Sequence, residues 1–298
     1  NEVRRDMNLP DVPWGDEPPP DPFALPTDAA LSGSGPFGTK GLNTRMSRDD
    51  HWKAFSDTLA QHEATFNKAM RRYFRDQSER VQSKLNAAFT LSVQEAGVPY
   101  SVRDIGPDDL FAIFDLDGEN EALKDATSPL YRRTVDSFGK RAAKVAGQSD
   151  VWNVSDPRVA NLIAQKVLRV TRVNATTKDM ITSILVDAAN ANATVSDVSR
   201  QLRTMFEDMS KVRSDTIART EMIGASNGAS AEGYRQAGVE QKEWLSSRDA
   251  DVRDSHQELD GEVVDLSHVF SNGLQFPGAD GPAEEVINCR CTVLPVLS

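Results

Sequence analysis

The sequence contains few cysteines, few aromatic residues and fewer basic than acidic residues. Two of its 298 residues are cysteines, Cys289 and Cys291, which excludes a disulfide-rich scaffold and a zinc site made of four cysteines from one chain. Aromatic residues make up 7% of the chain. Lys and Arg number 34 against 45 Asp and Glu, which gives a net charge of −11. Because affinity for phosphate depends on clustered basic residues, this balance disfavours sequence-specific nucleic-acid binding and adhesion to anionic membranes.

Long apolar runs and common catalytic motifs are also missing. No stretch approaches the roughly 18–20 consecutive apolar residues of a membrane span, and the polar start lacks a signal peptide. The chain begins with Asn1, so we expect a processed product or a fragment. Neither a Gly-Lys-Ser/Thr phosphate loop nor a Gly-x-Ser-x-Gly elbow occurs. A cytosolic-type protein that is built into an assembly fits these absences.

The chain divides into three expected regions, 1–46, 47–150 and 151–298. Residues 1–46 hold eight of the 15 prolines, which predicts an extended linker or a docking strap. Ser47 and Asp50 form a weak capping box. After them, apolar residues recur at helical spacing until Gly97 and Pro99, which predicts one very long helix.

The rest of the 47–150 region has weaker helical patterns, of which 123–145 is the strongest. Asp115-x-Asp117-Gly118 faintly resembles a calcium loop, but its glycine comes too early, so we expect a turn that connects helices.

Helix-start signals recur between residues 156 and 237. They place helices after Asp156-Pro157, at Thr177, at Ser196-Asp197 and from about Lys211 to Ala237, with Val212 on the core face of the last. The small residues of 224–230 predict close approach by another element. Strands are expected at 239–245, 261–264 and 289–294, with 267–285 as loop. The predicted fold class is mainly α with a small C-terminal α+β unit over 239–298, which combines long helices with a short antiparallel sheet.

Candidate chemistry gathers near the C-terminus, where His256 lies among seven acidic residues and precedes Asn288, Cys289, Arg290 and Cys291. A zinc site could use His256, Cys289 and Cys291, with a carboxylate or His268 as the fourth ligand. A Cys/His nucleophile pair is a second possibility, although nothing marks an oxyanion site.

The third interpretation, which we favour, is structural. His256 would join a polar network with Asp249, Arg253 and Asn288 that fixes the loop to the strands. We therefore expect no catalytic and no cofactor-binding residues, with bound zinc as the alternative.

The C-terminal third resembles the phage Mu F-like minor head proteins, also called head morphogenesis proteins. The resemblance rests on 217–221, 249–256 with its Asp-Ala-Asp-Val-Arg-Asp-Ser-His sequence, Leu259-Asp-Gly261, Phe276-Pro-Gly278 and 282–291, which ends in Asn-Cys-Arg-Cys. Many members carry Cys-x-x-Cys where this chain has 253–256, and His-Pro where it has 286–287. These departures weaken the zinc interpretation and favour the network of Arg253 and His256.

Residues 1–10 and Gly15-Asp16 resemble the end of a tailed-phage portal protein, which suggests a portal–minor head protein fusion. Together the resemblances imply a virion protein of the capsid interior near the portal vertex, found in the host cytoplasm during assembly. Implied partners are the portal protein and capsid or scaffold proteins, in a ring-like oligomer with the portal. Packaged DNA would lie nearby without sequence-specific binding, and no membrane is involved. The family implies roles in head assembly or in DNA packaging and delivery, with no established enzymatic activity; the alternatives are a DNA-co-injected effector enzyme and a zinc-stabilised adaptor.

Overall fold

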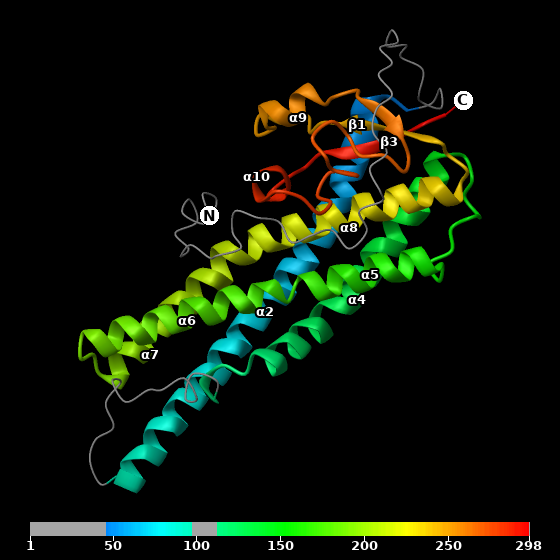
Figure 1. Ribbon diagram of the computed structural model, residues 1–298. Helices are drawn as coiled ribbons and strands as arrows, with labels where there is room; N and C mark the ends of the chain where they lie inside the picture. Colours follow the sequence, from blue (N-terminus) through cyan, green and yellow to red (C-terminus); the bar gives the residue numbers. More distant parts are fainter. Residues whose placement is uncertain (1–45, 97–111, 298) are drawn as a thin grey trace, which may run out of the picture.

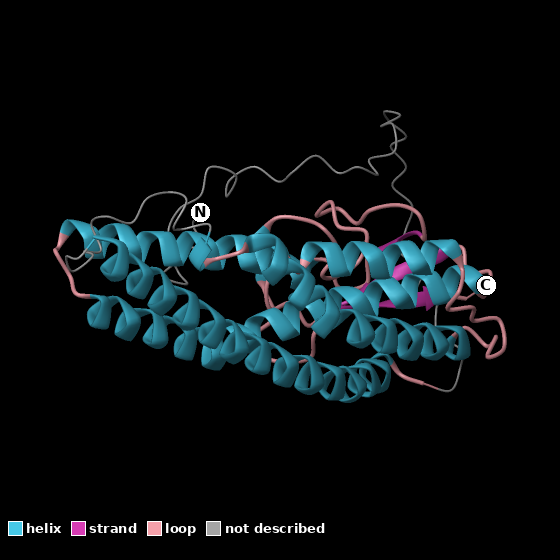
Figure 2. Cartoon of the chain, turned by 90° about the horizontal axis from the view of Figure 1, so that it is seen from below, coloured by secondary structure: helices cyan, strands magenta, loops and turns pink. Residues whose placement is uncertain are grey.

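Helices form most of the structure, and a small antiparallel sheet lies at one end of them (Figures 1 and 2). The computed structural model describes residues 46–96 and 112–297. The predicted fold class, mainly α with a small C-terminal α+β unit, is confirmed. The proline-rich segment before Met46 lies outside the described residues, as do Gly97 and Pro99.

Helix α2 is the long helix that the apolar spacing predicts, and it spans Arg48–Ala96. Ser47 caps it, because its Oγ accepts a hydrogen bond from the backbone N–H of Asp50 at 3.1 Å. The apolar positions of the predicted stripe are buried at Phe55, Leu59, Phe66, Met70, Phe74, Val81 and Leu85. A helix of 49 residues is about 70 Å long, so it runs the length of the molecule (Figure 1).

Helix α4 spans Leu116–Val145 and begins seven residues before the strongest predicted pattern. Asp115 is its N-cap and accepts a hydrogen bond from the backbone N–H of Gly118 at 3.0 Å. The turn at Asp115 therefore starts a helix. This explains why its glycine does not have the spacing of a calcium loop.

Helix α5 spans Pro157–Arg169 and starts as predicted, with Asp156 as its cap. Helix α6 spans Arg172–Asn190, so the predicted start at Thr177 is wrong. The hydroxyl of Thr177 donates to the carbonyl of Val173 one turn earlier, and the side chain is buried. A threonine that bonds back to the preceding turn gives the same sequence signal as a cap but lies inside the helix.

Helix α7 spans Val195–Asp208, and its capping box uses Thr194 with Asp197, so the cap lies two residues before the predicted Ser196 start. A π-helical segment, Met209–Arg213, joins α7 directly to α8, Ser214–Gln236. The predicted start at Lys211 is therefore wrong, because the chain does not leave the helix there. Val212 is also wrongly assigned to the core, since it is 70% exposed. The wider π turn changes which side chains face inward.

The small residues of α8 allow the close approach that the sequence predicts. A Cβ on Gly224 would lie 2.3 Å from the carbonyl oxygen of Gly278, and one on Gly233 would lie 2.6 Å from that of Gly139 on α4. Real Cβ atoms essentially never come that close to another heavy atom. The glycines therefore let α8 lie directly against both α4 and the C-terminal loop.

The sheet has the order β2-β1-β3, and both pairs are antiparallel. Its strands are β1, Gln241–Leu245; β2, Val263–Asp265; and β3, Thr292–Val296. The prediction of a third strand over 289–294 is partly wrong, because Cys289 and Cys291 precede β3. Two short helices, α9 at Asp254–Glu258 and α10 at Ala283–Val286, occupy stretches predicted as turn and loop. Helices of five and four residues are too short to show helical periodicity.

The sheet and its loops are fixed to the helices by buried polar contacts. Asn227 of α8 donates to the carbonyl of Cys291 at 2.9 Å, and its amide oxygen accepts from the hydroxyl of Thr292 at 2.8 Å. Tyr234 donates to the carbonyl of Val293 at 3.2 Å. Trp52 of α2 donates its indole N–H to the carbonyl of Arg290. One apolar core runs through both parts, while the predicted domain boundaries at residues 46 and 150 stay predictions.

None of the helices in the described ranges is both long and apolar enough to cross a bilayer.

Candidate metal centre and its polar surround

His256 is held in place by contacts on both sides of its ring. It lies on α9 and is 1% exposed. The indole of Trp244 on β1 packs against it edge-on, with ring centroids 5.1 Å apart. Nε2 lies 2.9 Å from Oε2 of Glu285, which therefore accepts a hydrogen bond if Nε2 carries the proton. That tautomer leaves the lone pair of Nδ1 facing the other side of the ring.

Cys289 and Cys291 lie on that other side. Their Sγ atoms are 3.6 and 3.5 Å from Nδ1 of His256, and both residues are free, buried cysteines. The three candidate ligand atoms lie within 4.8 Å of one another. The predicted strand over 289–294 would have put the two thiols on one side of the sheet. Instead, they occupy the loop before β3, which follows Asn288 with its positive φ of 58°.

The pKa values of the two thiols shift in opposite directions. A hydrogen bond from the Cys289 thiol lowers the pKa of Cys291 below that of an ordinary thiol. The same hydrogen bond and burial raise the pKa of Cys289 well above its usual value. The two thiols are therefore a coupled pair in which Cys291 is the more acidic member.

These donors fit a tetrahedral metal ion in spacing but not in number. Zinc–sulfur bonds of about 2.3 Å and zinc–nitrogen bonds of about 2.0–2.1 Å put tetrahedral N and S ligands about 3.5 Å apart. The sulfur–nitrogen distances here are 3.5 and 3.6 Å. A carboxylate on the far nitrogen, as Glu285 provides, is the usual support of a metal-binding histidine. Structural zinc sites take four protein ligands, however, and the cluster found among the described residues has three.

His268, considered from the sequence as a fourth ligand, lies on the surface. Its side chain is 69% exposed and pairs with Asp265 at 3.2 Å. It is not part of the cluster.

The other predicted network residues surround the cluster without hydrogen bonding to His256. Asp249 pairs with Arg290 at 3.1 Å, Arg253 donates to the carbonyl of Ile287, and Asn288 accepts from Arg219 at 3.3 Å. These contacts fix the loop to α8 and to the turn at residues 249–251, which we call the Asp-rich turn. The direct partner of His256 is Glu285, which the sequence reasoning missed. The sequence feature that could have pointed to Glu285 is its position three residues before Asn288.

Comparisons with known proteins find a matching family model and several similar proteins. Residues 179–294 match the family model described as Phage Mu protein F like protein. An uncharacterized protein of Bacillus subtilis, YqbB, is 24% identical over 201 residues, which cover 62% of this chain and 64% of that protein. An uncharacterized protein of Haemophilus influenzae is 24% identical over 140 residues, 47% of this chain and 30% of that protein.

A third relative carries an enzyme name. The NAD(+)–arginine ADP-ribosyltransferase EFV of Enterococcus faecalis is 38% identical over 88 residues, which are 27% of this chain and 18% of that protein. The chain thus spans less than two thirds of each of these three relatives. No solved structure matches it significantly. Residues 179–294, which contain His256, Cys289 and Cys291, match the model of the Phage Mu protein F-like family, the family that the C-terminal motifs resemble.

Proposed function

We propose that this chain is a structural minor head protein of a tailed phage, with a role in head assembly or in DNA packaging and delivery. The observation that carries the proposal is the match of residues 179–294 to the Phage Mu protein F-like family. That family points to a head morphogenesis protein that associates with the virion and contacts other head proteins. A long helical body with a small module fixed at one end suits a structural role (Figure 2).

The proposed position is the capsid interior at the portal vertex, where several copies would form a ring on the portal. Support comes from the proline-rich 1–46 region and its portal-like start. Capsid or scaffold proteins would be further partners. Packaged DNA would lie close by without sequence-specific binding, which the net charge of −11 disfavours.

Head purification tests this proposal. Heads assembled with the full chain should contain it, and heads assembled without the portal should lose it. A chain that lacks residues 1–30 should fold normally but fail to co-purify with the portal. Portal binding by this truncated chain would contradict the tether, and absence of the full chain from purified heads would contradict the structural role.

An enzymatic role is the less favoured alternative. The resemblance to an ADP-ribosyltransferase covers 18% of that protein, so it does not bring the named activity to this chain. His256, Cys289 and Cys291 are each 1% exposed, whereas a nucleophile and its base must reach a substrate. We expect a folded Cys289→Ser variant to support full infectivity. Loss of infectivity with normal incorporation into heads would favour an effector enzyme.

A zinc-stabilised adaptor is favoured by one observation, the convergence of His256, Cys289 and Cys291. If a metal is bound, the full purified chain should contain close to one zinc per molecule, and chelation should lower its melting temperature. Glu285→Gln should weaken zinc binding by about 10–100-fold, because it replaces the charged carboxylate that accepts from Nε2 of His256 with a neutral amide. This alternative would be excluded if the purified protein contains no metal and its melting temperature changes with neither zinc nor chelator.

A further inference from the structure

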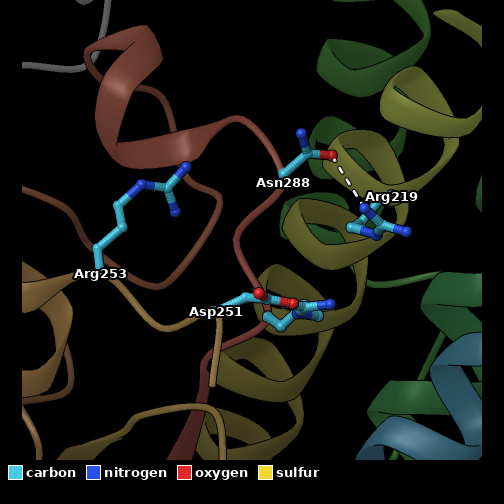
Figure 3. A pocket seen from close by; sticks show the side chains of 5 residues that line it. Arg219, Asp251, Arg253 and Asn288 are labelled. Atoms are coloured by element: carbon cyan, nitrogen blue, oxygen red, sulfur yellow. Dashed lines mark hydrogen bonds and ion pairs between the residues drawn. The ribbon is translucent and has the colours of Figure 1, made fainter. Parts of the chain in front are cut away.

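A hollow of about 350 Å³ opens beside the loop that precedes β3. Three arginines line it together with one aspartate and one asparagine: Arg219, Arg253, Arg290, Asp251 and Asn288. We call it the arginine pocket. Arg219 comes from α8, Arg253 immediately precedes α9, and the other lining residues come from the Asp-rich turn and the loop (Figure 3). Figure 3 shows Arg253 on one side of the pocket and Arg219 on the other.

The wall of the pocket is held in a fixed conformation. Asn288 has a φ of 58°, a backbone conformation that asparagine tolerates better than most residues. Its backbone N–H donates to Oγ1 of Thr220 at 3.2 Å, and its side-chain oxygen accepts from Arg219 at 3.3 Å. Both contacts attach the loop to α8. The pocket is therefore positioned before any ligand arrives, which reduces the entropy lost on binding.

The three guanidinium groups differ in how many of their N–H donors already have a partner. Arg290 is paired with Asp249 at 3.1 Å and with Asp251 at 2.8 Å. Within the described part of the chain, Arg219 makes one side-chain hydrogen bond, to Asn288, and Arg253 makes one, to the carbonyl of Ile287. A guanidinium has five N–H donors in a planar fork, so most donors of these two arginines remain open.

We propose that the arginine pocket binds a carboxylate side chain presented by an acidic segment of a partner protein. Three arginines and one aspartate give the lining a charge of +2 in a chain whose net charge is −11. Arginine binds carboxylates through two parallel hydrogen bonds, and the pairing of Arg290 with Asp249 shows this chemistry at the pocket itself. The bound carboxylate would lie between Arg219 and Arg253, which line opposite sides of the pocket. A long polyanion such as DNA would be repelled by the acidic residues around the pocket.

The binding of a carboxylate follows from the pocket alone, whereas the identity of the partner as another head protein rests on the proposed function. The two can fail separately. A chain that binds acidic peptide but is absent from heads would overturn the proposed function and leave the pocket standing.

A peptide titration with the full chain tests the inference. The probe is a fluorescent, capped peptide with two glutamates among glycines and serines, and its glutamine counterpart is the control ligand. The glutamate peptide should bind, and the glutamine peptide should not. Arg219→Gln and Arg253→Gln should each weaken binding by about tenfold or more, because each removes charge-assisted hydrogen bonds. Arg200→Gln is the matched control, since Arg200 is an exposed, ion-paired arginine on α7; binding should not change.

The variants Arg219→Lys and Arg253→Lys distinguish the effect of the planar guanidinium geometry from that of the positive charge. Lysine keeps the charge but cannot bind in the same two-pronged way, so partial loss is expected. Melting temperatures check that the variants fold. The proposal would be overturned if the glutamate peptide does not bind. It would also be overturned if both Arg→Gln variants bind that peptide as tightly as the unchanged protein. Arginine-dependent binding of inorganic phosphate or of a short DNA duplex, without peptide binding, would overturn it in favour of a phosphate site.

Discussion

At the scale of single residues, packing distance decides which glycines of α8 are required. A Cβ at Gly224 would meet a backbone oxygen, that of Gly278, at 2.3 Å, and also Nζ of Lys166. At Gly228 the nearest atoms are the side-chain ends of Leu162 at 2.9 Å and Phe276 at 3.1 Å. Side-chain ends can shift, whereas a backbone carbonyl held by its own loop cannot do so without moving the loop.

Gly224→Ala should therefore lower the unfolding free energy by about 1–3 kcal/mol, even though alanine favours a helix by about 1 kcal/mol over glycine. Gly228→Ala, on the same helix, should cost clearly less. Urea unfolding of the two variants measures the difference. Equal stability of the two would show that the contact with Gly278 is looser than the structure indicates.

Lys166 is a buried cation that gives the protein a defined pH dependence. Burial lowers its pKa from 10.5 to about 8; Glu221 on α8 opposes this shift, and Arg169 on α5 adds to it. Between these two pKa values the unfolded chain binds a proton that the folded chain does not. The unfolding free energy therefore rises with pH through this window, and below pH 8 the penalty of burying the charge is fully present.

We expect the unfolding free energy to increase by on the order of 1 kcal/mol between pH 8 and pH 9.5. Lys166→Met should reduce the slope. It should not abolish it, because burial also lowers the pKa of Lys242 to about 8. Urea unfolding at a series of pH values checks this, and an unchanged slope in the variant would refute it. The range stops at 9.5 because Tyr131 and Tyr234 have raised pKa values, which favour the opposite trend at higher pH.

At the scale of elements, helix starts follow local chemistry when a side chain closes the first turn. Ser47, Asp115, Asp156 and Thr194 each accept a backbone N–H at a helix start. Two of these caps, Ser47 and Asp156, were evident from the sequence. The starts of α6 and α8 were misplaced because neither has a side-chain cap: α6 follows α5 after a short break, and α8 continues from a π segment.

Thr194→Ala should remove the capping box of α7 and lower the unfolding free energy by about 1 kcal/mol. Thr204→Ala is the matched control on the exposed face of the same helix, and we expect it to be neutral or slightly stabilising. Thermal unfolding of both variants tests the cap. A loss of stability in Thr204→Ala as large as that in Thr194→Ala would contradict this assignment.

At the scale of the whole molecule, the sheet and the helices share one apolar core. Salt bridges from Arg48 to Glu243 at 2.9 Å and from Arg248 to Asp49 at 2.9 Å join the start of α2 to the C-terminal unit. Such partly exposed pairs contribute little stability individually. The buried contacts of Asn227 and Tyr234 are the stronger coupling, because their loss leaves polar groups unpaired in the core.

The described part of the chain should therefore unfold as one cooperative unit. Near-ultraviolet circular dichroism, which reports the packing of Trp244 against His256 and Phe270, should change at the same urea concentration as the helical signal. Asn227→Ala should shift both transitions together. An early aromatic transition would show instead that the sheet unit unfolds separately from the helices.

The sequence alone determined the features that depend on neighbours along the chain. Helical spacing fixed the long helix of 48–96, and small residues marked the close contact of α8, because both signals are contained in one segment. The candidate cluster of His256, Cys289 and Cys291 was also identified as residue types, and the motifs around it indicated the family.

Only the tertiary structure decided which of these residues meet. It brings Glu285 to His256 and places Arg219, from α8, across from Arg253. Residues 34 positions apart in sequence, such as Arg253 and Ile287, come together because the start of α9 lies beside the end of α10. Local propensity contains no information about such pairings, since they arise from how the elements bury their shared apolar faces.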